Sequence, residues 1–573
     1  MASYSWHLAL KQEGEKTERN EPFKHSLRQD MCDLASGIKI QNSKMHRGKR
    51  VKQNDWESEK TEKVISRVKS NMHKKHESDS KSGGIEVLLP SLIGIIVLGC
   101  AIVAKMGWRG RSAVAGIDLG TTNSVICVQQ QSKGVGKIQC IPDPFNGSPI
   151  IPSVVSITDP HHTKWNVQNN KKGSIGENLF PPTSMVTVGA AAKARIDSHP
   201  HHTFYHAKRV LGHSYYDDAV VELMKEVEFG IVPNGTEIAF RVPFHTDDKD
   251  GSSSDSIFIA PHRVGSYIVN HLISITQSFL GHENVKSAVI AVPAKFEAKQ
   301  IQETVQAFRD AGVSVARILE EPVAAALAYG LQKKENVDFI LVYDFGGGTL
   351  DVSILQVSNG FVDVIGNDGD NQLGGADFDA AVAQLLLYDN DNRGLNIVNR
   401  VTESLSNIES TVGRDSEEDM EEILSTRCTR LQDAPLCSIS SLHTLAEKMK
   451  IKLSSSDAEI VYEMCLGLPM SGSLPSDVSS FCEALEPVRF SVNSEAFESS
   501  CALLFDRALV PIERLLEDLD MTAKDIDEVV MVGGTTKMPN IRKIVQNKML
   551  VDSLNTSIDP DLTVAYGAAS VID

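Results

Sequence analysis

Two segments of the chain share one pattern of apolar and polar positions: an apolar run, a short polar turn and a second apolar run. The first segment covers 116–128 and the second covers 342–355. This pattern predicts two pairs of strands, each pair joined by a tight turn. Both turns contain glycine and threonine, and an aspartate precedes each of them, Asp118 in the first segment and Asp344 in the second.

The residues of these turns suit phosphate binding. Glycine lets backbone N–H groups approach a phosphate without a Cβ in the way, and a threonine hydroxyl adds a donor. The aspartate can hold a hydrated Mg²⁺. One such turn is more often an ordinary connection between strands. Two copies in one chain, however, predict an internal duplication in which two lobes close on one nucleotide.

An apolar run without charge occupies 87–104 and stands apart from both segments. It predicts a transmembrane or signal-anchor segment over 85–108. Residues 1–84 are polar and lysine-rich, and we expect a mostly disordered tail there. Basic residues are more numerous upstream of the run, which favours a cytosolic N-terminus and a lumenal C-terminal part. A cleaved signal peptide is the alternative, although the run begins far from the N-terminus for such a peptide.

The remaining chain divides into one lobe around each turn, 114–335 and 336–573. In the first lobe, 153–260 predict an inserted, loop-rich subdomain, and helices are expected over 300–311 and 322–331. In the second lobe, two polar stretches predict surface insertions near 389–444 and 466–486. If this part is lumenal, the sequons at Asn234 and Asn555 are acceptors for N-glycans.

Composition narrows the possible functions. The chain has 573 residues, with 57 Lys and Arg against 75 Asp and Glu, so its net charge of −18 argues against a nucleic-acid-binding surface. Its nine cysteines form no Cys-x-x-Cys pair, so neither a zinc site nor a thioredoxin-like motif is indicated. In an oxidising compartment Cys428 could pair with Cys437, and Cys465 with Cys482. Free thiols are the alternative, because spacing alone does not decide.

Five further segments appear in a fixed order, at 207–212, 292–296, 321–330, 532–539 and 559–569. With the two turns they resemble the actin-like ATPase superfamily and, in detail, the seventy-kilodalton heat-shock chaperones. The resemblance covers the chain from about residue 114 and implies an α/β, two-lobed actin-like fold with duplicated ribonuclease-H-like lobes. Because the matching motifs run to the last residues of the sequence, the resemblance leads us to expect a core without a peptide-binding domain. The chain therefore resembles the microsome-associated branch of that family.

The resemblance also implies roles for individual residues around Mg²⁺ and ATP or ADP. Lys208 matches the lysine that polarises the γ-phosphate and the attacking water. Asp118, Asp344 and Glu321 would order Mg²⁺, largely through water. Thr349 and Asp351 match the residues that position the water and a monovalent cation such as K⁺. Without this context Lys208 would be an ordinary surface lysine. The residues implied to contact the phosphates are Gly120, Thr121, Thr122, Asn123, Gly346, Gly347, Gly348 and Thr349.

The implied nucleoside site departs from the family pattern. Glu447 and Lys450 would face the ribose and Ser454 the base, while the turn of Gly533, Gly534 and Thr535, with Lys537 and Asp561, would lie beneath the adenosine. Ile451 stands where the family has a stacking arginine, and Lys537 replaces its partner, so guanidinium stacking on adenine is lost or weakened. Ile301 likewise replaces the arginine that couples the switch at Pro293 to the substrate domain.

Two hypotheses of different classes follow from these patterns. The first is an ATP-binding, slowly hydrolysing chaperone-type core that acts in protein homeostasis and the stress response of the endoplasmic reticulum. Its partners would be the membrane, through 87–104, and co-chaperones or ubiquitin-like proteostasis proteins on the lobe surfaces, with no nucleic acid. The second is a non-catalytic, nucleotide-dependent interaction module. A small-molecule kinase of the same superfold is disfavoured by the detailed heat-shock motifs.

Overall fold

The computed structural model describes most of the chain from Ala113 onward. The tail 1–84 and the apolar run 87–104 lie outside this part, as does the acidic run 414–422. Within the described part, no helix is both long and apolar enough to cross a bilayer. The described residues are 113–132, 135–157, 181, 183–196, 199–245, 254–281, 284–388, 392–412, 424, 427–432, 434–455 and 458–572.

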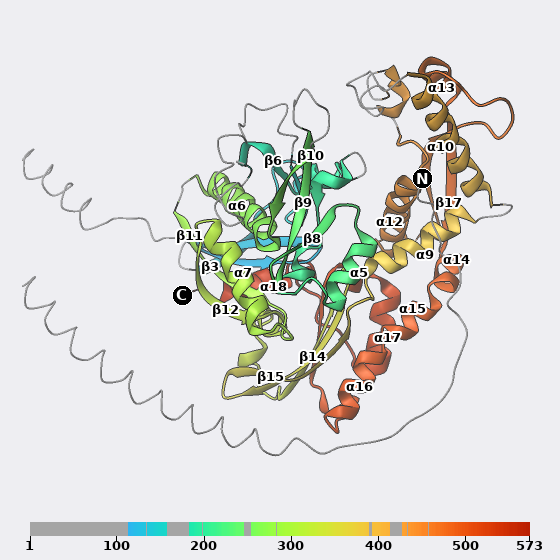
Figure 1. Ribbon diagram of the computed structural model, residues 1–573. Coiled ribbons are helices and arrows are strands. Elements are labelled where there is room, and N and C mark those ends of the chain that lie inside the picture. The colour runs from blue at the N-terminus through green and yellow to red at the C-terminus, as the bar shows by residue number, and fades with distance from the viewer. Residues whose placement is uncertain are drawn as a thin grey trace, which may run out of the picture. The chain divides into compact units, whose positions relative to one another are not determined.

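The first sheet is built around the first predicted strand pair (Figure 1). Its strands follow the order β12-β11-β1-β2-β3, and β4 also pairs with β2. The strand β1 is parallel to β11 and antiparallel to β2, and β2 is antiparallel to β3. The bounds are Ala113–Leu119 (β1), Asn123–Ser132 (β2), Val135–Cys140 (β3), Ile151–Pro152 (β4), Val285–Val292 (β11) and Ser314–Glu320 (β12).

The second sheet repeats this scheme. Its order is β15-β14-β13-β18, with β13, β14 and β15 forming an antiparallel meander and β18 lying parallel to β13. In both sheets the first strand of a meander therefore also pairs with a parallel strand from much later in the chain, which agrees with the predicted duplication. The bounds are Phe339–Phe345 (β13), Leu350–Ser358 (β14), Phe361–Asp370 (β15) and Glu528–Val532 (β18).

The helices beside the first sheet follow local signals. The helix α6 has proline at its first position and ends at Gly281, whose φ of 70° is the left-handed conformation that glycine adopts without cost. The two predicted helices are confirmed as α7 and α8, with ends shifted by up to three residues. The bounds are Pro261–Leu280 (α6), Ala298–Asp310 (α7), Glu321–Ala328 (α8) and Thr563–Ser570 (α18), with the short turn Leu331–Lys333 (η6).

The last helix, α18, packs on β1 and α8, although the predicted division at residue 336 places it in the second lobe. Two glycines permit this close approach. A Cβ on Gly116 would lie 2.2 Å from the Ala569 nitrogen, and one on Gly567 would lie 1.8 Å from the Ala324 oxygen. The helix α18 thus packs against the first sheet, although it lies more than 200 residues after the strands of that sheet.

The inserted part of the first lobe contains more sheet than its loop-rich prediction. Two three-stranded sheets form, in the orders β6-β5-β7 and β10-β9-β8. Phe204, Phe229 and Phe240 pack together with ring centroids 5.0–5.7 Å apart. These strands are held by an aromatic core rather than by a long periodic pattern, so the sequence signal is weak. The elements are Val155–Ile157 (β5), Thr183–Met185 (η3), Val186–Val188 (β6), Ala190–Lys193 (α4), Pro200–His202 (η4), Thr203–Phe204 (β7), Ala207–Val210 (η5), Asp218–Glu226 (α5), Gly230–Asn234 (β8), Glu237–His245 (β9) and Ser254–Ile259 (β10).

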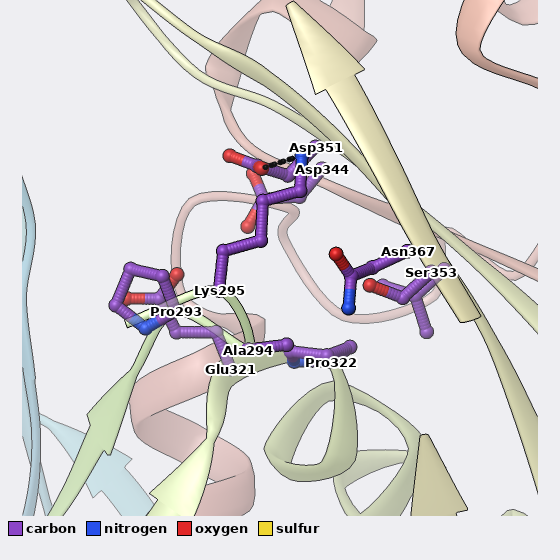
Figure 2. A pocket seen from close by; sticks show the side chains of 10 residues that line it. Pro293, Ala294, Lys295, Glu321, Pro322, Asp344, Asp351, Ser353 and Asn367 are labelled. Atoms are coloured by element: carbon purple, nitrogen blue, oxygen red, sulfur yellow. Dashed lines mark ion pairs between the residues drawn. The ribbon is translucent and has the colours of Figure 1, made fainter. Parts of the chain in front are cut away.

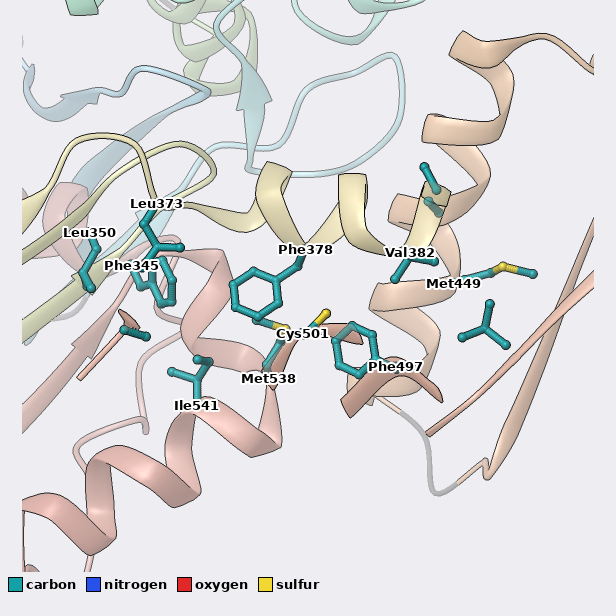
Figure 3. Packing of buried hydrophobic residues seen from close by; sticks show 14 of the residues in the cluster. Phe345, Leu350, Leu373, Phe378, Val382, Met449, Phe497, Cys501, Met538 and Ile541 are labelled. Carbon is teal, nitrogen blue, oxygen red and sulfur yellow. The ribbon is translucent and has the colours of Figure 1, made fainter. Parts of the chain in front are cut away.

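The second lobe has the larger apolar core. Figure 3 shows Phe345 of the sheet, Phe378 of α9 and Ile541 of α17 packed within it, all of them fully buried. The helices are Gly375–Leu387 (α9), Arg393–Val412 (α10), Ile439–Ser455 (α12), Val478–Ala484 (α13), Ser494–Ser500 (α14), Ala502–Arg507 (α15), Val510–Asp518 (α16) and Pro539–Met549 (α17); the hairpin strands are Ile460–Gly467 (β16) and Glu486–Asn493 (β17); the short turns are Thr429–Gln432 (η8), Ala523–Asp525 (η9) and Gly534–Lys537 (η10).

The two predicted surface insertions of this lobe form a folded unit instead. Residues from both stretches share a small core, in which Val401, Ile408 and Phe481 are almost fully buried. The backbone of the two stretches is also joined, because the Cys437 nitrogen donates to the Leu466 oxygen at 2.8 Å. Their polar composition hid this core, since its apolar residues are spread over two separate stretches of sequence.

The two pairs that the sequence analysis named as possible, Cys428 with Cys437 and Cys465 with Cys482, do not form. The bonds join Cys428 to Cys482 and Cys437 to Cys465, so each connects the first stretch to the second, and the Cα atoms of each pair are 5.1 Å apart. A third bond joins Cys127 to Cys140, which face each other on β2 and β3. Among the described residues, Cys501 remains a free thiol and is buried.

Candidate functional site

The two glycine-rich turns face each other. A Cβ on Gly347 would lie 2.9 Å from the Thr122 hydroxyl oxygen, so only glycine fits at this approach. The first turn is fixed by Ser153, whose hydroxyl donates to the Gly120 oxygen at 2.8 Å. The second is fixed by Thr535, whose hydroxyl donates to the Gly346 oxygen at 2.8 Å. Distant segments therefore hold both predicted phosphate turns in one place.

The start of α9 supports the second turn from behind. A Cβ on Gly374 would lie 2.3 Å from the Gly348 nitrogen and Cα atom. The next two residues bind the turn directly, since the Gly375 nitrogen donates to the Gly346 oxygen at 3.1 Å and the Ala376 nitrogen donates to the Gly347 oxygen at 2.8 Å. The position of the turn thus depends on close contact with α9.

Lys208 is buried beside the carboxylates predicted to order Mg²⁺. It lies on η5, and its Nζ atom is 2.7 Å from Glu321 Oε1 at the start of α8. Its ammonium also lies 5.8 Å from the centre of the Phe296 ring. Burial lowers the pKa of Lys208, but the Glu321 and Asp118 carboxylates outweigh this and raise it above its usual range. Lys208 is therefore a buried, protonated side chain and not a surface lysine.

The nearby aspartates are strained electrostatically. Burial raises the pKa of Asp118 to about 7, with Glu321 adding to the rise and Lys208 opposing it. Burial likewise raises the pKa of Asp344 well above its usual range, again with a contribution from Glu321. The Oδ1 atom of Asp118 is buried and has no hydrogen-bond partner. An orphaned oxygen among crowded carboxylates is the environment that a divalent cation would stabilise.

The donor set fits a hydrated Mg²⁺. Within the described part of the chain, no three His, Cys, Asp or Glu side chains converge closely enough to hold a metal directly. Mg²⁺ commonly keeps several waters and binds through one or two carboxylates together with phosphate oxygens. Asp118 and Asp344 would hold it in that way, with Glu321 nearby.

A small cavity opens beside these carboxylates (Figure 2). Glu321, Asp344 and Asp351 of the predicted set line it, together with Lys295, Ser353 and Asn367. In this cavity Lys295 Nζ lies 3.3 Å from Asp351 Oδ1. The sequence analysis did not assign a role to Lys295. The available signal was a charged residue inside the 292–296 segment, where the neighbours are apolar.

Arg209 is a second residue that the sequence analysis missed. Its Nη2 atom donates to the Gly348 oxygen at 3.2 Å, and a Cβ on that glycine would lie 2.1 Å from the same nitrogen. A guanidinium against a phosphate turn can bind phosphate oxygens in a fixed geometry. The signal was its position next to Lys208, because both residues lie on the same short turn, η5.

The turn implied to lie beneath the adenosine follows β18. Gly533 has a φ of 81°, and a Cβ there would lie 2.4 Å from the Phe345 oxygen at the end of β13. A Cβ on Gly534 would lie 2.9 Å from Asp561 Oδ1. Lys537 Nζ is 2.7 Å from both Asp559 Oδ1 and Asp561 Oδ2. Two carboxylates thus hold the Lys537 ammonium.

The helix α12 carries the residues implied to contact the nucleoside. Glu447 lies 3.3 Å from Lys193 of α4, which is a contact between the two lobes. Lys450 Nζ lies 2.8 Å from Asp379 Oδ1 and donates to the Gly375 oxygen at 3.0 Å. Both side chains therefore have protein partners, and their contact with ribose stays a prediction. Ile451 is 53% exposed, and the loss of a stacking arginine at this position stays a prediction.

The paired sheets and the facing turns define a mixed α/β protein with a nucleotide-binding type of site. The chain belongs to the Hsp70 family: the family model described as Hsp70 protein matches 179–408 and 432–572, more than half of the chain. This result confirms the family resemblance read from the sequence motifs. Members of this family are ATPases that bind ATP or ADP with Mg²⁺.

Individual relatives agree with this assignment. The chain is 34% identical over 457 residues to the chaperone protein dnaK of Cyanophora paradoxa, which covers 80% of this chain and 59% of that protein. It is 33% identical over 467 residues to human heat shock 70 kDa protein 13, covering 80% of this chain and 87% of that protein. The protein of that name from Pongo abelii gives the same identity and coverage. The chain thus spans under two thirds of the length of its dnaK relatives.

Proposed function

We propose that this protein binds ATP with Mg²⁺ and hydrolyses it slowly, as a chaperone-type nucleotide-binding core of the endoplasmic reticulum. One observation carries the proposal. The two glycine-rich turns face each other, Lys208 is buried beside them, and Asp118 and Asp344 are half-buried there with raised pKa values. Burial of so much charge is costly unless a ligand or ion compensates it. A magnesium nucleotide would supply that compensation.

Each part of the site has a task in phosphoryl transfer to water. The backbone N–H groups of the two turns would hold phosphate oxygens, and bound Mg²⁺ would neutralise the charge of the phosphates. Lys208, kept protonated by Glu321, would stabilise the charge that develops on the γ-phosphate. Asp351, at the entrance of β14, would orient the attacking water. Catalysis then rests on position and electrostatics, which suits a slow enzyme.

Single-turnover hydrolysis tests the proposal most directly. Purified protein is mixed with a lower concentration of ATP, with and without Mg²⁺, and the formation of ADP is followed over time. We expect complete conversion that depends on Mg²⁺ and follows a single exponential. Binding of ATP without any conversion would instead support the second hypothesis, a nucleotide-dependent interaction module. Ile451 is exposed and Lys537 is paired with two aspartates, so neither side chain is placed to stack on adenine as an arginine would. Both features favour that alternative.

We expect this protein to release ADP rapidly, because Ile451 and Lys537 do not stack on adenine as two arginines would. Each lost cation–π contact costs about 0.5–1 kcal/mol, so changing both residues to arginine should tighten ADP roughly tenfold. The variant is Ile451→Arg/Lys537→Arg, and the measurement is a stopped-flow chase of a fluorescent ADP analogue. The control, Ile460→Arg/Lys548→Arg, places the same two changes on the surface of the second lobe, away from the turn after β18. Equal release from the double variant and the parent would show that these positions do not control adenine stacking.

The proposed compartment is the lumen of the endoplasmic reticulum. The three disulfide bonds among the described residues support it, because disulfides persist in oxidising compartments and are rare in the cytosol. The apolar run 87–104 and its upstream basic flank support an anchor with the core on the lumenal side. Partners would then be lumenal co-chaperones or proteostasis proteins. Ile460 and Tyr462, 46% and 61% exposed on one face of β16, are candidate contacts for them.

This orientation predicts glycosylation at one of the two sequons. Asn234 is the last residue of β8, exposed just before the turn into β9, and should carry an N-glycan. Asn555 is half-buried, and its amide donates to Glu528 Oε2 at 2.7 Å, so we expect it to stay unmodified, in contrast to the expectation from sequence. Digestion of intact microsomes with protease should leave the core protected until detergent is added. A core that is digested without detergent would place it in the cytosol. The Asn234→Gln variant should lose the glycan, and Asn555→Gln should not.

A further inference from the structure

Lys295 forms an ion pair with Asp351, and the family resemblance implied no role for this lysine. It follows β11 in the first lobe and reaches β14 in the second, where its Nζ atom lies 3.3 Å from Asp351 Oδ1. Figure 2 shows the ion pair inside the cavity lined also by Glu321 and Asp344. Lys295 of the first lobe therefore places a positive charge beside the carboxylate of Asp351 in the second lobe.

The strand beside Asp351 leaves space for this ammonium. Gly369 on β15 is the register partner of Asp351. A Cβ on Gly369 would lie 2.7 Å from Lys295 Nζ and 3.2 Å from Asp351 Oδ1. A larger residue would push the ammonium away from the carboxylate. The neighbouring strands β14 and β15 thus form a space into which the Lys295 ammonium fits beside Asp351.

Asp351 needs a positive charge at this place. Its side chain is 37% exposed. Partial burial still raises the pKa of its carboxyl, while Lys295 opposes this rise and Glu321 adds to it. A second ammonium that acts on this carboxyl, that of Lys208, is already paired with Glu321 at 2.7 Å. Lys295 is consequently the group that compensates the charge of Asp351.

The family resemblance implies a monovalent cation at Thr349 and Asp351, and the residues present do not fit it. An ammonium group and a potassium ion carry the same charge and have similar radii. The ammonium already lies against Asp351 Oδ1, so a K⁺ at that oxygen would meet repulsion at close range. Resting on the proposed nucleotide binding, we propose that Lys295 takes the place of the monovalent cation, so that nucleotide binding by this protein is independent of K⁺.

The salt dependence of nucleotide affinity tests this proposal. The full chain is titrated with a fluorescent ADP analogue and Mg²⁺ in KCl, NaCl or LiCl at equal ionic strength. We expect the affinity of the parent to vary by no more than about twofold among the three salts. In Lys295→Gln, which removes the ammonium, affinity in LiCl should fall roughly tenfold below that in KCl. Lys295→Arg, which keeps a positive charge, should remain closer to the parent.

A matched control lies four residues further on. Lys299 pairs with Glu237 at 3.8 Å outside the cavity, and Lys299→Gln should behave as the parent does in every salt. Thermal unfolding verifies that each variant is folded; should Lys295→Gln not fold, the salt series of the parent decides alone. Strong K⁺ dependence of the parent, or a Lys295→Gln variant as insensitive as the parent, would overturn the proposal. Absence of nucleotide binding by the parent in all salts would instead refute the proposed function, and this inference with it.

Discussion

Replacement of Lys208 by alanine should lower single-turnover ATP hydrolysis by about 100-fold, the usual scale for a positioned group that handles charge or a proton in the transition state. Nucleotide binding should be retained, because the turns that hold the phosphates are fixed by other residues, Ser153 and Thr535. The measurement is ADP formation with enzyme in excess, together with the affinity for labelled ADP. The loss should therefore appear in the rate of conversion and not in the affinity.

Loss of Lys208 also leaves Glu321 without its 2.7 Å partner, so the stability of the variant must be checked by thermal unfolding. Lys208→Met keeps an unbranched side chain beside Phe296 but removes the ammonium and its hydrogen bond to Glu321; it should show the same rate loss, with less lost packing than in Lys208→Ala. Lys299→Ala, on the surface of the first lobe, is the control and should hydrolyse ATP at the parental rate. Rates of Lys208→Ala and Lys208→Met equal to the parent would remove Lys208 from the catalytic set.

Substitution of Gly374 by alanine should have an effect of similar size through geometry alone. The backbone at Gly374 is extended, with φ of −156° and ψ of −176°, so alanine meets no conformational strain there. Its Cβ, however, would lie 2.3 Å from the Gly348 backbone, and the second phosphate turn would have to move. A displacement of about 1 Å in a positioning element can lower a rate about 100-fold. Hydrolysis and nucleotide affinity should therefore fall together, unlike in the Lys208 variant.

The control for Gly374→Ala adds a side chain where space is open. No heavy atom lies within 4 Å of a Cβ on Gly281, and its left-handed conformation after α6 is one that asparagine tolerates. Gly281→Asn should keep both affinity and rate. If Gly374→Ala binds ADP and hydrolyses ATP as the parent does, then α9 does not set the position of the second turn.

Features that lie within short contiguous segments could be predicted from the sequence. The hairpin of β1 and β2 and that of β13 and β14 were found because strand, turn and strand follow one another directly. The helix α7 begins with a capping box of Glu297 and Gln300, and α8 has Pro322 in its first turn, so both carry local start signals. Lys208 and Glu321 were placed in the site by motif resemblance, and the structure shows them 2.7 Å apart. Their catalytic roles remain predictions.

Contacts between distant segments could not be predicted in the same way. The pairing of Cys428 with Cys482 depends on a small core shared by two polar stretches, and spacing alone did not decide between the possible partners. Lys193 meets Glu447 only because α4 and α12 come together from different lobes. The role of Lys295 was invisible for the same reason, since its partner is on β14 of the other lobe. Each of these contacts is decided by tertiary packing rather than by local pattern.

The sequence by itself determined the family, the duplicated strand–turn–strand units and the residue types of a nucleotide site, because these depend on local order and on motifs. Only the tertiary structure decided the disulfide pairs, the placement of α18 on the first sheet and the ion pair of Lys295 with Asp351. The physical reason is that a motif fixes the conformation of its own backbone. Which charges and thiols finally meet is set by how sheets and helices far apart in the chain bury their apolar faces against one another.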